Sequence, residues 1–96
     1  MYDQQKIQKR FSNVAQSTTF RNIVSSCRLD EKKVLDIGCS YGEHLVHFGK
    51  GSVGITITEP EVVFGKANGI DIRYGNIEDS DFTLGQTFDA IFANNI

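Results

Sequence analysis

The residues best suited to chemistry lie between positions 34 and 42. The apolar run 34–37 contains one acid, Asp36, and leads into the turn 38–42, which has a glycine at each end. Glycine permits backbone conformations that are closed to other residues and allows a ligand to approach closely. The Asp36 carboxylate would repel a phosphate but would attract a cationic ligand, directly or through water. The pattern therefore predicts a site for a cationic small molecule.

The surrounding residues predict the elements that position this site. Leu45, Val46 and Phe48 follow the turn, and we expect a helix there. A strand, a glycine turn and a helix are typical of an open α/β sheet, in which ligands bind at the carboxyl ends of the strands. Dinucleotide sites have Gly-x-Gly-x-x-Gly with no charge in the turn, unlike the order Asp-x-Gly-x-x-x-Gly found here. A plain turn of another doubly wound protein is the alternative.

Further strand and helix signals follow the turn. Residues 52–57 predict a strand, and Thr58 with Glu61 forms a capping-box pattern that begins a helix. Asn68-Gly69 is a helix stop, and residues 70–74 alternate as a strand does. Residues 88–96 contain another apolar run, in which we expect the fourth strand.

In this order the segments resemble the class I S-adenosylmethionine-dependent methyltransferases, across residues 18–96. The turn is similar to their motif I, Asp/Glu-x-Gly-x-Gly-x-Gly, with Ser40 at the middle glycine. Thr56 stands where the family usually has an acid that binds the ribose hydroxyls. Residues 75–79 resemble the adenine-binding segment, with Asn76 at its acidic position. Residues 88–96 resemble motif IV.

The resemblance implies S-adenosylmethionine as the cofactor, and it implies a role for each matching residue. Asp36 would interact with the methionine ammonium. Thr56 and Glu59 would face the ribose, with Glu61 as an alternative to Glu59, although both acids also suit a helix N-terminus. The implied cofactor-binding residues are Asp36, Gly38, Cys39, Ser40, Gly42, Thr56, Ile57, Glu59, Asn76, Ile77, Ala93 and Asn94.

Two of these implied roles concern the ends of the cofactor. Asn76 would bind the adenine amino group through its carbonyl, and Ile77 would pack against the ring. Alternatively, Asn76 is a turn residue that bonds its own backbone. The backbone near Ala93 and Asn94 would meet the methionine end.

The expected fold class is α/β, a Rossmann-like parallel sheet of about four strands in the order 3-2-1-4 with flanking helices. Residues 1–96 form one cofactor-binding module, with N-terminal helices in 1–30 and a partial sheet in 34–96. The family has seven strands, and the absent half usually carries the substrate-binding and catalytic residues. We therefore expect a methyltransferase, or its cofactor-binding fragment, with an unknown methyl acceptor and no nameable catalytic residue. The alternative is a non-catalytic module that acts through assembly, because the fourth strand, 90–94, would lie at a sheet edge and favour a homo-oligomer.

Helical spacing predicts two helices before the turn, in residues 3–15 and 18–28, with Ser17 or Thr18 as a cap. Tyr2 and Phe11 are either packing residues or lid residues over the cofactor. His44 and His47 share a helix face but lack a third metal ligand at a matching spacing, so we expect solvated side chains. Cys39 could have a lowered pKa beside a helix N-terminus, although a space-filling role is favoured.

Composition excludes several classes of function. A net charge of −2 gives no electrostatic case for nucleic-acid binding. No apolar stretch approaches the length of a membrane span, and the first residues lack the apolar core of a signal peptide. The two cysteines, Cys27 and Cys39, do not suggest a disulfide scaffold, so we expect reduced thiols and a cytoplasmic location.

Overall fold

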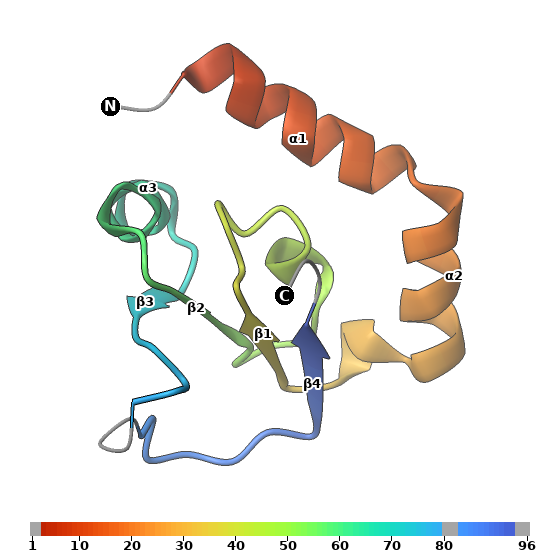
Figure 1. The fold of residues 1–96 in the computed structure, drawn as a ribbon. Helices are drawn as coiled ribbons and strands as arrows, with labels where there is room; N and C mark the ends of the chain where they lie inside the picture. Colours follow the sequence, from red (N-terminus) through yellow and green to blue (C-terminus); the bar gives the residue numbers. More distant parts are fainter. Residues whose placement is uncertain (1–2, 80–82, 94–96) are drawn as a thin grey trace.

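A four-stranded parallel sheet lies at the centre of the structure, a computed structural model that describes residues 3–79 and 83–93. The strands are β1 (Val34–Ile37), β2 (Val53–Thr56), β3 (Ile72–Tyr74) and β4 (Ala90–Ala93). Their order is β3-β2-β1-β4 (Figure 1), and every pairing is parallel. The predicted fold class is therefore confirmed.

In the described part of the chain, three α-helices accompany the sheet: α1 (Gln4–Gln16), α2 (Thr18–Cys27) and α3 (Glu59–Asn68). Ser17 separates the first two, and its hydroxyl accepts a hydrogen bond from Phe20 N at the start of α2, which confirms the predicted cap. Gly69 ends α3 in the left-handed conformation, as the helix stop predicted. In Figure 1, α1 spans the distance between α3 and α2. Within the described residues, no helix is both long and apolar enough to cross a bilayer.

The prediction of a helix after the glycine turn is wrong. Only a short 3₁₀ turn, η2 (Leu45–His47), forms there. The chain must return to β2 within residues 43–52, and Gly49 and Gly51 weaken helix formation in this short stretch. Gly49 also lies against the segment before β1, where a Cβ would stand 2.5 Å from Lys32 O.

An aromatic cluster packs α2 against both ends of η2 and against β4. Phe20 of α2 is 5% exposed, and its ring centroid lies 4.8 Å from His44 and 5.5 Å from His47. The Phe92 ring of β4 lies 5.8 Å from the same phenylalanine. The two histidines are thus packing residues rather than solvated ones, and their burial lowers the pKa of both imidazoles.

The aromatic residue of α1, Phe11, faces α3. The Phe11 ring lies 6.0 Å from the Phe64 ring, and Tyr41 of the glycine turn stacks edge-on against the same ring. Phe11 therefore packs in this arrangement between α1, α3 and the turn. Tyr2, the other residue considered for a lid, lies outside the described residues.

Candidate functional site

The turn between β1 and η2 depends on three residues in the left-handed conformation. Gly38, Ser40 and Gly42 have φ values of 69°, 56° and 87°. This conformation costs an L-residue about 1–2 kcal/mol, whereas glycine adopts it freely. The left-handed conformation at position 40 therefore explains why the family pattern has a glycine there. Ser40 adopts the same conformation under strain.

Several N–H groups of this turn bond within the chain. Gly38 N and Cys39 N both donate to Ile55 O, at 3.0 Å each. Tyr41 N donates to the Glu43 carboxylate at 3.1 Å. Phosphate sites instead direct free turn N–H groups and a helix N-terminus at the anion. With these donors engaged and only the 3₁₀ turn η2 beyond, the turn is poorly suited to a pyrophosphate.

Gly54 of β2 makes room for the turn, a role that the sequence analysis missed. A Cβ at this position would lie 2.6 Å from the Cys39 sulfur and 2.9 Å from Leu45 Cδ2. Cys39 is consequently buried, and burial together with the Asp36 carboxylate raises the pKa of its thiol. The lowered pKa considered from the sequence is wrong, and Cys39 has a space-filling role. An isolated glycine inside a strand is the signal that could have indicated this close approach.

A groove of about 360 Å³ lies at the carboxyl ends of β1, β2 and β3. It is lined by Ile37, Gly38, Ser40, Ile55, Thr56, Ile57, Thr58, Glu61, Gly75, Asn76, Ile77 and Glu78. Apolar side chains alternate with hydroxyl, amide and carboxylate groups. Two of the lining residues are acidic and none is Lys or Arg. The groove therefore favours an uncharged or cationic ligand over an anionic one.

The structure brings half of the predicted cofactor-binding residues together in this groove. Those that line it are Gly38, Ser40, Thr56, Ile57, Asn76 and Ile77. Those elsewhere are Asp36, Cys39, Gly42, Glu59 and Ala93, and Asn94 lies outside the described residues.

Each residue outside the groove has a clear structural position. A Cβ on Gly42 would lie 2.9 Å from Ile70 Cγ2, so this glycine packs toward the β3 segment. Glu59 is exposed at the start of α3. Ala93 ends β4, which pairs with β1 on the side away from β2.

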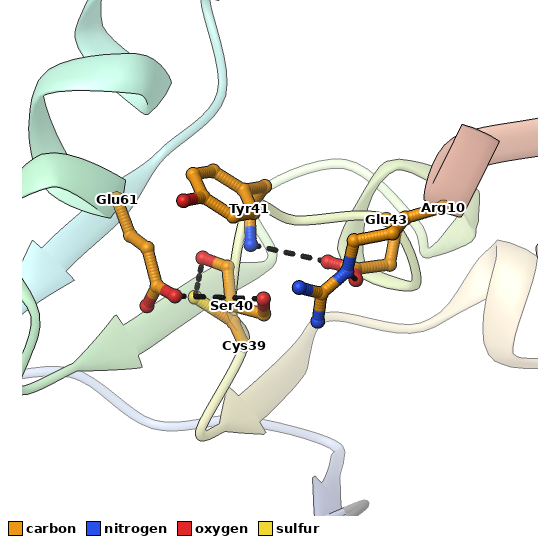
Figure 2. A network of polar contacts seen from close by, with 6 residues as sticks. All are labelled: Arg10, Cys39, Ser40, Tyr41, Glu43 and Glu61. Atoms are coloured by element: carbon orange, nitrogen blue, oxygen red, sulfur yellow. Dashed lines mark hydrogen bonds and ion pairs between the residues drawn. The ribbon is translucent and has the colours of Figure 1, made fainter. Parts of the chain in front are cut away.

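The Glu61 carboxylate reaches the groove from the first turn of α3. Thr58 is the N-cap, but its side chain makes no capping hydrogen bond, so the predicted capping box is wrong. The carboxylate instead accepts a 2.5 Å hydrogen bond from the Thr56 hydroxyl. Its other oxygen accepts a longer contact, 3.5 Å, from Ser40 Oγ, and Figure 2 shows Glu61 extending toward the turn.

Asn76 serves the backbone and the groove at once. Its carbonyl Oδ1 accepts a 3.0 Å hydrogen bond from Glu78 N, which is the turn role that the sequence left open. An amide oxygen has a second lone pair for a further donor. The neighbouring Ile77 lines the groove and is 45% exposed, so its side chain offers apolar surface to a ligand.

Asp36 is the least satisfied polar group of the region. It is 2% exposed, and its Oδ2 has no hydrogen-bond partner among the described residues. Burial, and secondarily the nearby Glu43 carboxylate, raises the pKa of Asp36 to about 7. A buried carboxylate of this kind is costly unless a donor or a cation satisfies it.

A second carboxylate, Glu43, is satisfied from α1. It is 4% exposed and accepts a 2.8 Å charge-assisted hydrogen bond from Arg10 Nε. The Arg10 guanidinium also lies 5.6 Å from the centre of the Tyr41 ring. Figure 2 shows Glu43 and Glu61 on opposite sides of the turn, one held by α1 and the other extending from α3.

A second hollow, of about 790 Å³, lies beside α2 and contains none of the predicted site residues. Its lining mixes basic residues (Arg21 and Arg28) with acidic ones (Asp30 and Glu31), so it has no consistent charge preference. Across residues 3–79 and 83–93, no three His, Cys, Asp or Glu side chains gather as metal ligands. The groove at the strand ends is thus the better candidate site.

Comparison with known proteins bears on the fold of the chain. No protein-family model and no curated protein matches the chain. Among solved structures, DesVI from Streptomyces venezuelae is similar, with 21% identity and a TM-score of 0.69. CalS10 from Micromonospora echinaspora, solved with bound S-adenosylmethionine and described as an amino pentose methyltransferase in calicheamicin biosynthesis, has 20% identity and a TM-score of 0.69.

These two matches cover 98% of the present chain but only 44% of DesVI and 42% of CalS10. The chain therefore spans less than half the length of either protein. The β3-β2-β1-β4 sheet and the glycine turn belong to the shared part. The resemblance indicated by the motifs is confirmed in the architecture, and the chain has a methyltransferase-like fold.

Proposed function

We propose that this chain binds S-adenosylmethionine and provides the cofactor-binding half of a methyltransferase. The observation that carries the proposal is Asp36, a buried carboxylate two residues before Gly38 whose Oδ2 has no partner among the described residues. A cationic ligand held through water would satisfy it, whereas a phosphate would be repelled. The acidic lining of the neighbouring groove favours the same choice.

The groove offers complementary groups along its length. Asn76 and Ile77 would hold the adenine, and the polar groups around Thr56 and Glu61 would hold the ribose. Gly38 would leave space for the ligand, since nothing lies within 4 Å of a Cβ built there. When bound, S-adenosylmethionine would supply the methyl group of its sulfonium to an N, O, C or S nucleophile. The chain's own contribution would be positioning and exclusion of water.

Calorimetry with S-adenosylmethionine, S-adenosylhomocysteine and NAD tests this proposal. We expect saturable binding of both adenosyl ligands and weaker binding of NAD, because the turn has engaged its N–H donors and presents a carboxylate. Equal or tighter binding of NAD would overturn the assignment.

The free cysteines Cys27 and Cys39 fit a reducing compartment, and we propose a cytoplasmic location.

The edge strand β4 favours a second, compatible function in assembly. Among the described strands, β4 pairs with β1 alone, and its segment Ala90–Ala93 carries no charge. Ile91 is 66% exposed and points to the side of the sheet opposite Phe92. Uncharged edges of this kind pair readily with further strands. We propose that a second copy of this chain covers the edge, through a two-fold contact.

Light scattering over a concentration series tests the association. We expect dimers that Ile91→Lys dissociates, because a lysine on an edge strand opposes pairing. Val63→Lys, on an equally open position of α3 that is 55% exposed, is the matched control and should leave the mass unchanged. A monomer at all concentrations would contradict the proposal.

A further inference from the structure

We infer that Glu61 is the specificity-determining carboxylate for a vicinal diol in the groove, and that Thr56 and Ser40 act through it. The inference rests on the proposed binding of an adenosyl ligand. It joins two of the three departures from the family pattern, a hydroxyl in place of the middle glycine and a hydroxyl in place of the ribose-binding acid. Both hydroxyls point to the same carboxylate.

The hydrogen bonds of Thr56 leave it poorly able to bind a ribose itself. Its hydroxyl has one proton, which it donates to Glu61 Oε1. The Thr56 hydroxyl oxygen also accepts a hydrogen bond from the backbone N–H of Thr58, at 3.1 Å. A ribose hydroxyl that needs an acceptor therefore finds only one remaining lone pair on Thr56, whereas the adjacent Glu61 carboxylate has two acceptor oxygens.

Glu61 keeps capacity for two further donors. A carboxylate has about four acceptor positions on its two oxygens. Thr56 occupies one position on Oε1, and Ser40 approaches one on Oε2 from the other side of the groove. One position on each oxygen is left, which matches the two adjacent hydroxyls of a ribose. Glu59 is exposed and outside the groove lining, so it lacks this geometry.

The position of Glu61 predicts how Thr56→Asp changes ligand binding. Adding an acid at the usual family position would place two carboxylates within hydrogen-bonding distance of each other in a partly buried groove. Like charges at that separation repel, and one of them would be protonated or displaced. An aspartate at position 56 should thus weaken ligand binding while Glu61 is present. Once Glu61 is replaced by glutamine, the same aspartate should bind the ribose hydroxyls.

The experiment measures the dissociation constants of S-adenosylhomocysteine and of its 2′-deoxyribose analogue by calorimetry. The wild-type chain should prefer the ribose form by at least about tenfold, since a hydrogen bond to a carboxylate is stronger than one to a neutral acceptor. Glu61→Gln should abolish that preference, and Thr56→Asp should weaken ribose binding by about tenfold. The double variant Thr56→Asp/Glu61→Gln should recover affinity to within about threefold of wild type.

Two outcomes would overturn the inference while leaving the proposed function intact: an unchanged ribose preference in Glu61→Gln, or tighter binding in Thr56→Asp alone. Loss of the preference in Glu59→Gln instead would assign the role to the other acid of α3. Failure of the wild-type chain to bind S-adenosylhomocysteine would overturn the proposed function as well. Thermal unfolding of each variant separates lost binding from lost folding.

Discussion

Two carboxylates near the glycine turn, Glu61 and Asp36, differ in burial and in their hydrogen-bond partners. On the α3 side, Glu61 is half-buried, lines the groove and accepts two hydroxyl contacts. Within β1, Asp36 is 2% exposed, lies near the Glu43 carboxylate, and has an oxygen without a partner among the described residues. The first group is already oriented by its own chain. The second is destabilising as it stands, which is the signature of a position arranged for a ligand rather than for stability.

The largest expected effect concerns Asp36 and pH. Its pKa is raised from 3.8 to about 7 in the folded chain, so the folded state holds a proton that the unfolded state has lost between these values. The stabilisation is thus fully present below pH 4 and is lost as pH rises through 7, by an amount on the order of a few kcal/mol. Asp36→Asn should remove most of this pH dependence and raise the free energy of unfolding at pH 8. Urea titrations at pH 5 and pH 8 measure both.

The same substitution should separate stability from binding. Asp36→Asn keeps the shape of the side chain but removes its charge, so affinity for S-adenosylhomocysteine should fall by at least about tenfold. A variant that is more stable at pH 8 yet binds equally well would show that the buried carboxylate has no role in holding the ligand. An unfolding free energy that rises with pH in the wild type would contradict the raised pKa.

The second prediction uses two glycines with the same backbone conformation. Gly38 and Gly69 both have φ of +69°, and a Cβ at either position would meet nothing within 4 Å. Gly38→Val and Gly69→Val should therefore destabilise the chain equally, by about 1–2 kcal/mol. Only Gly38 lines the groove, so only Gly38→Val should abolish ligand binding in calorimetry. Equal loss of binding in the two variants would point to strain rather than steric exclusion.

The third prediction compares two ion pairs of nearly equal length. Arg10–Glu43 is 2.8 Å long with a Glu43 side chain that is 5% exposed, whereas Arg73–Asp71 is 2.9 Å long between side chains that are 42% and 49% exposed. Arg10→Met should cost about 1–2 kcal/mol, because it removes the cationic partner of a buried carboxylate and leaves Tyr41 N–H as its donor. Arg73→Met should cost less than about 0.5 kcal/mol. Equal costs, from urea titrations of both variants, would show that Glu43 finds another donor.

Much of this fold was predictable because its signals are local. The caps at Ser17 and Gly69 each depend on a few neighbouring residues, and they appear where the sequence placed them. The turn was recognisable from its glycines because the left-handed conformation restricts residue choice there. Parallel order followed from the succession of strands and crossovers.

What failed depended on contacts between distant segments. Nothing near Leu45 in sequence reveals that Gly49 must pack against the segment before β1, and that contact shortens the expected helix. Glu61 has the spacing of a capping box, but Thr56, on another element, competes for its carboxylate. The choice between Glu59 and Glu61 at the groove is likewise decided by side-chain direction in three dimensions, which residue type alone does not carry.

The smallest expected effect concerns Ser40 and Arg28, the two described non-glycine residues in the left-handed conformation. Ser40 has φ of 56° and Arg28 has φ of 55°, but only Ser40 contacts Glu61. Replacing either by glycine removes strain of about 1–2 kcal/mol, but the added entropy of the unfolded chain costs about 0.5–1 kcal/mol. Arg28→Gly should therefore raise the free energy of unfolding by about 0.5 kcal/mol. Ser40→Gly should gain slightly less, since its 3.5 Å contact with the carboxylate is weak. Urea titrations of both variants measure the difference. A Ser40→Gly variant that is clearly less stable than wild type would mean that the serine holds Glu61 more firmly than this distance implies, and that both sides of the turn are arranged around their carboxylates at a cost in backbone strain.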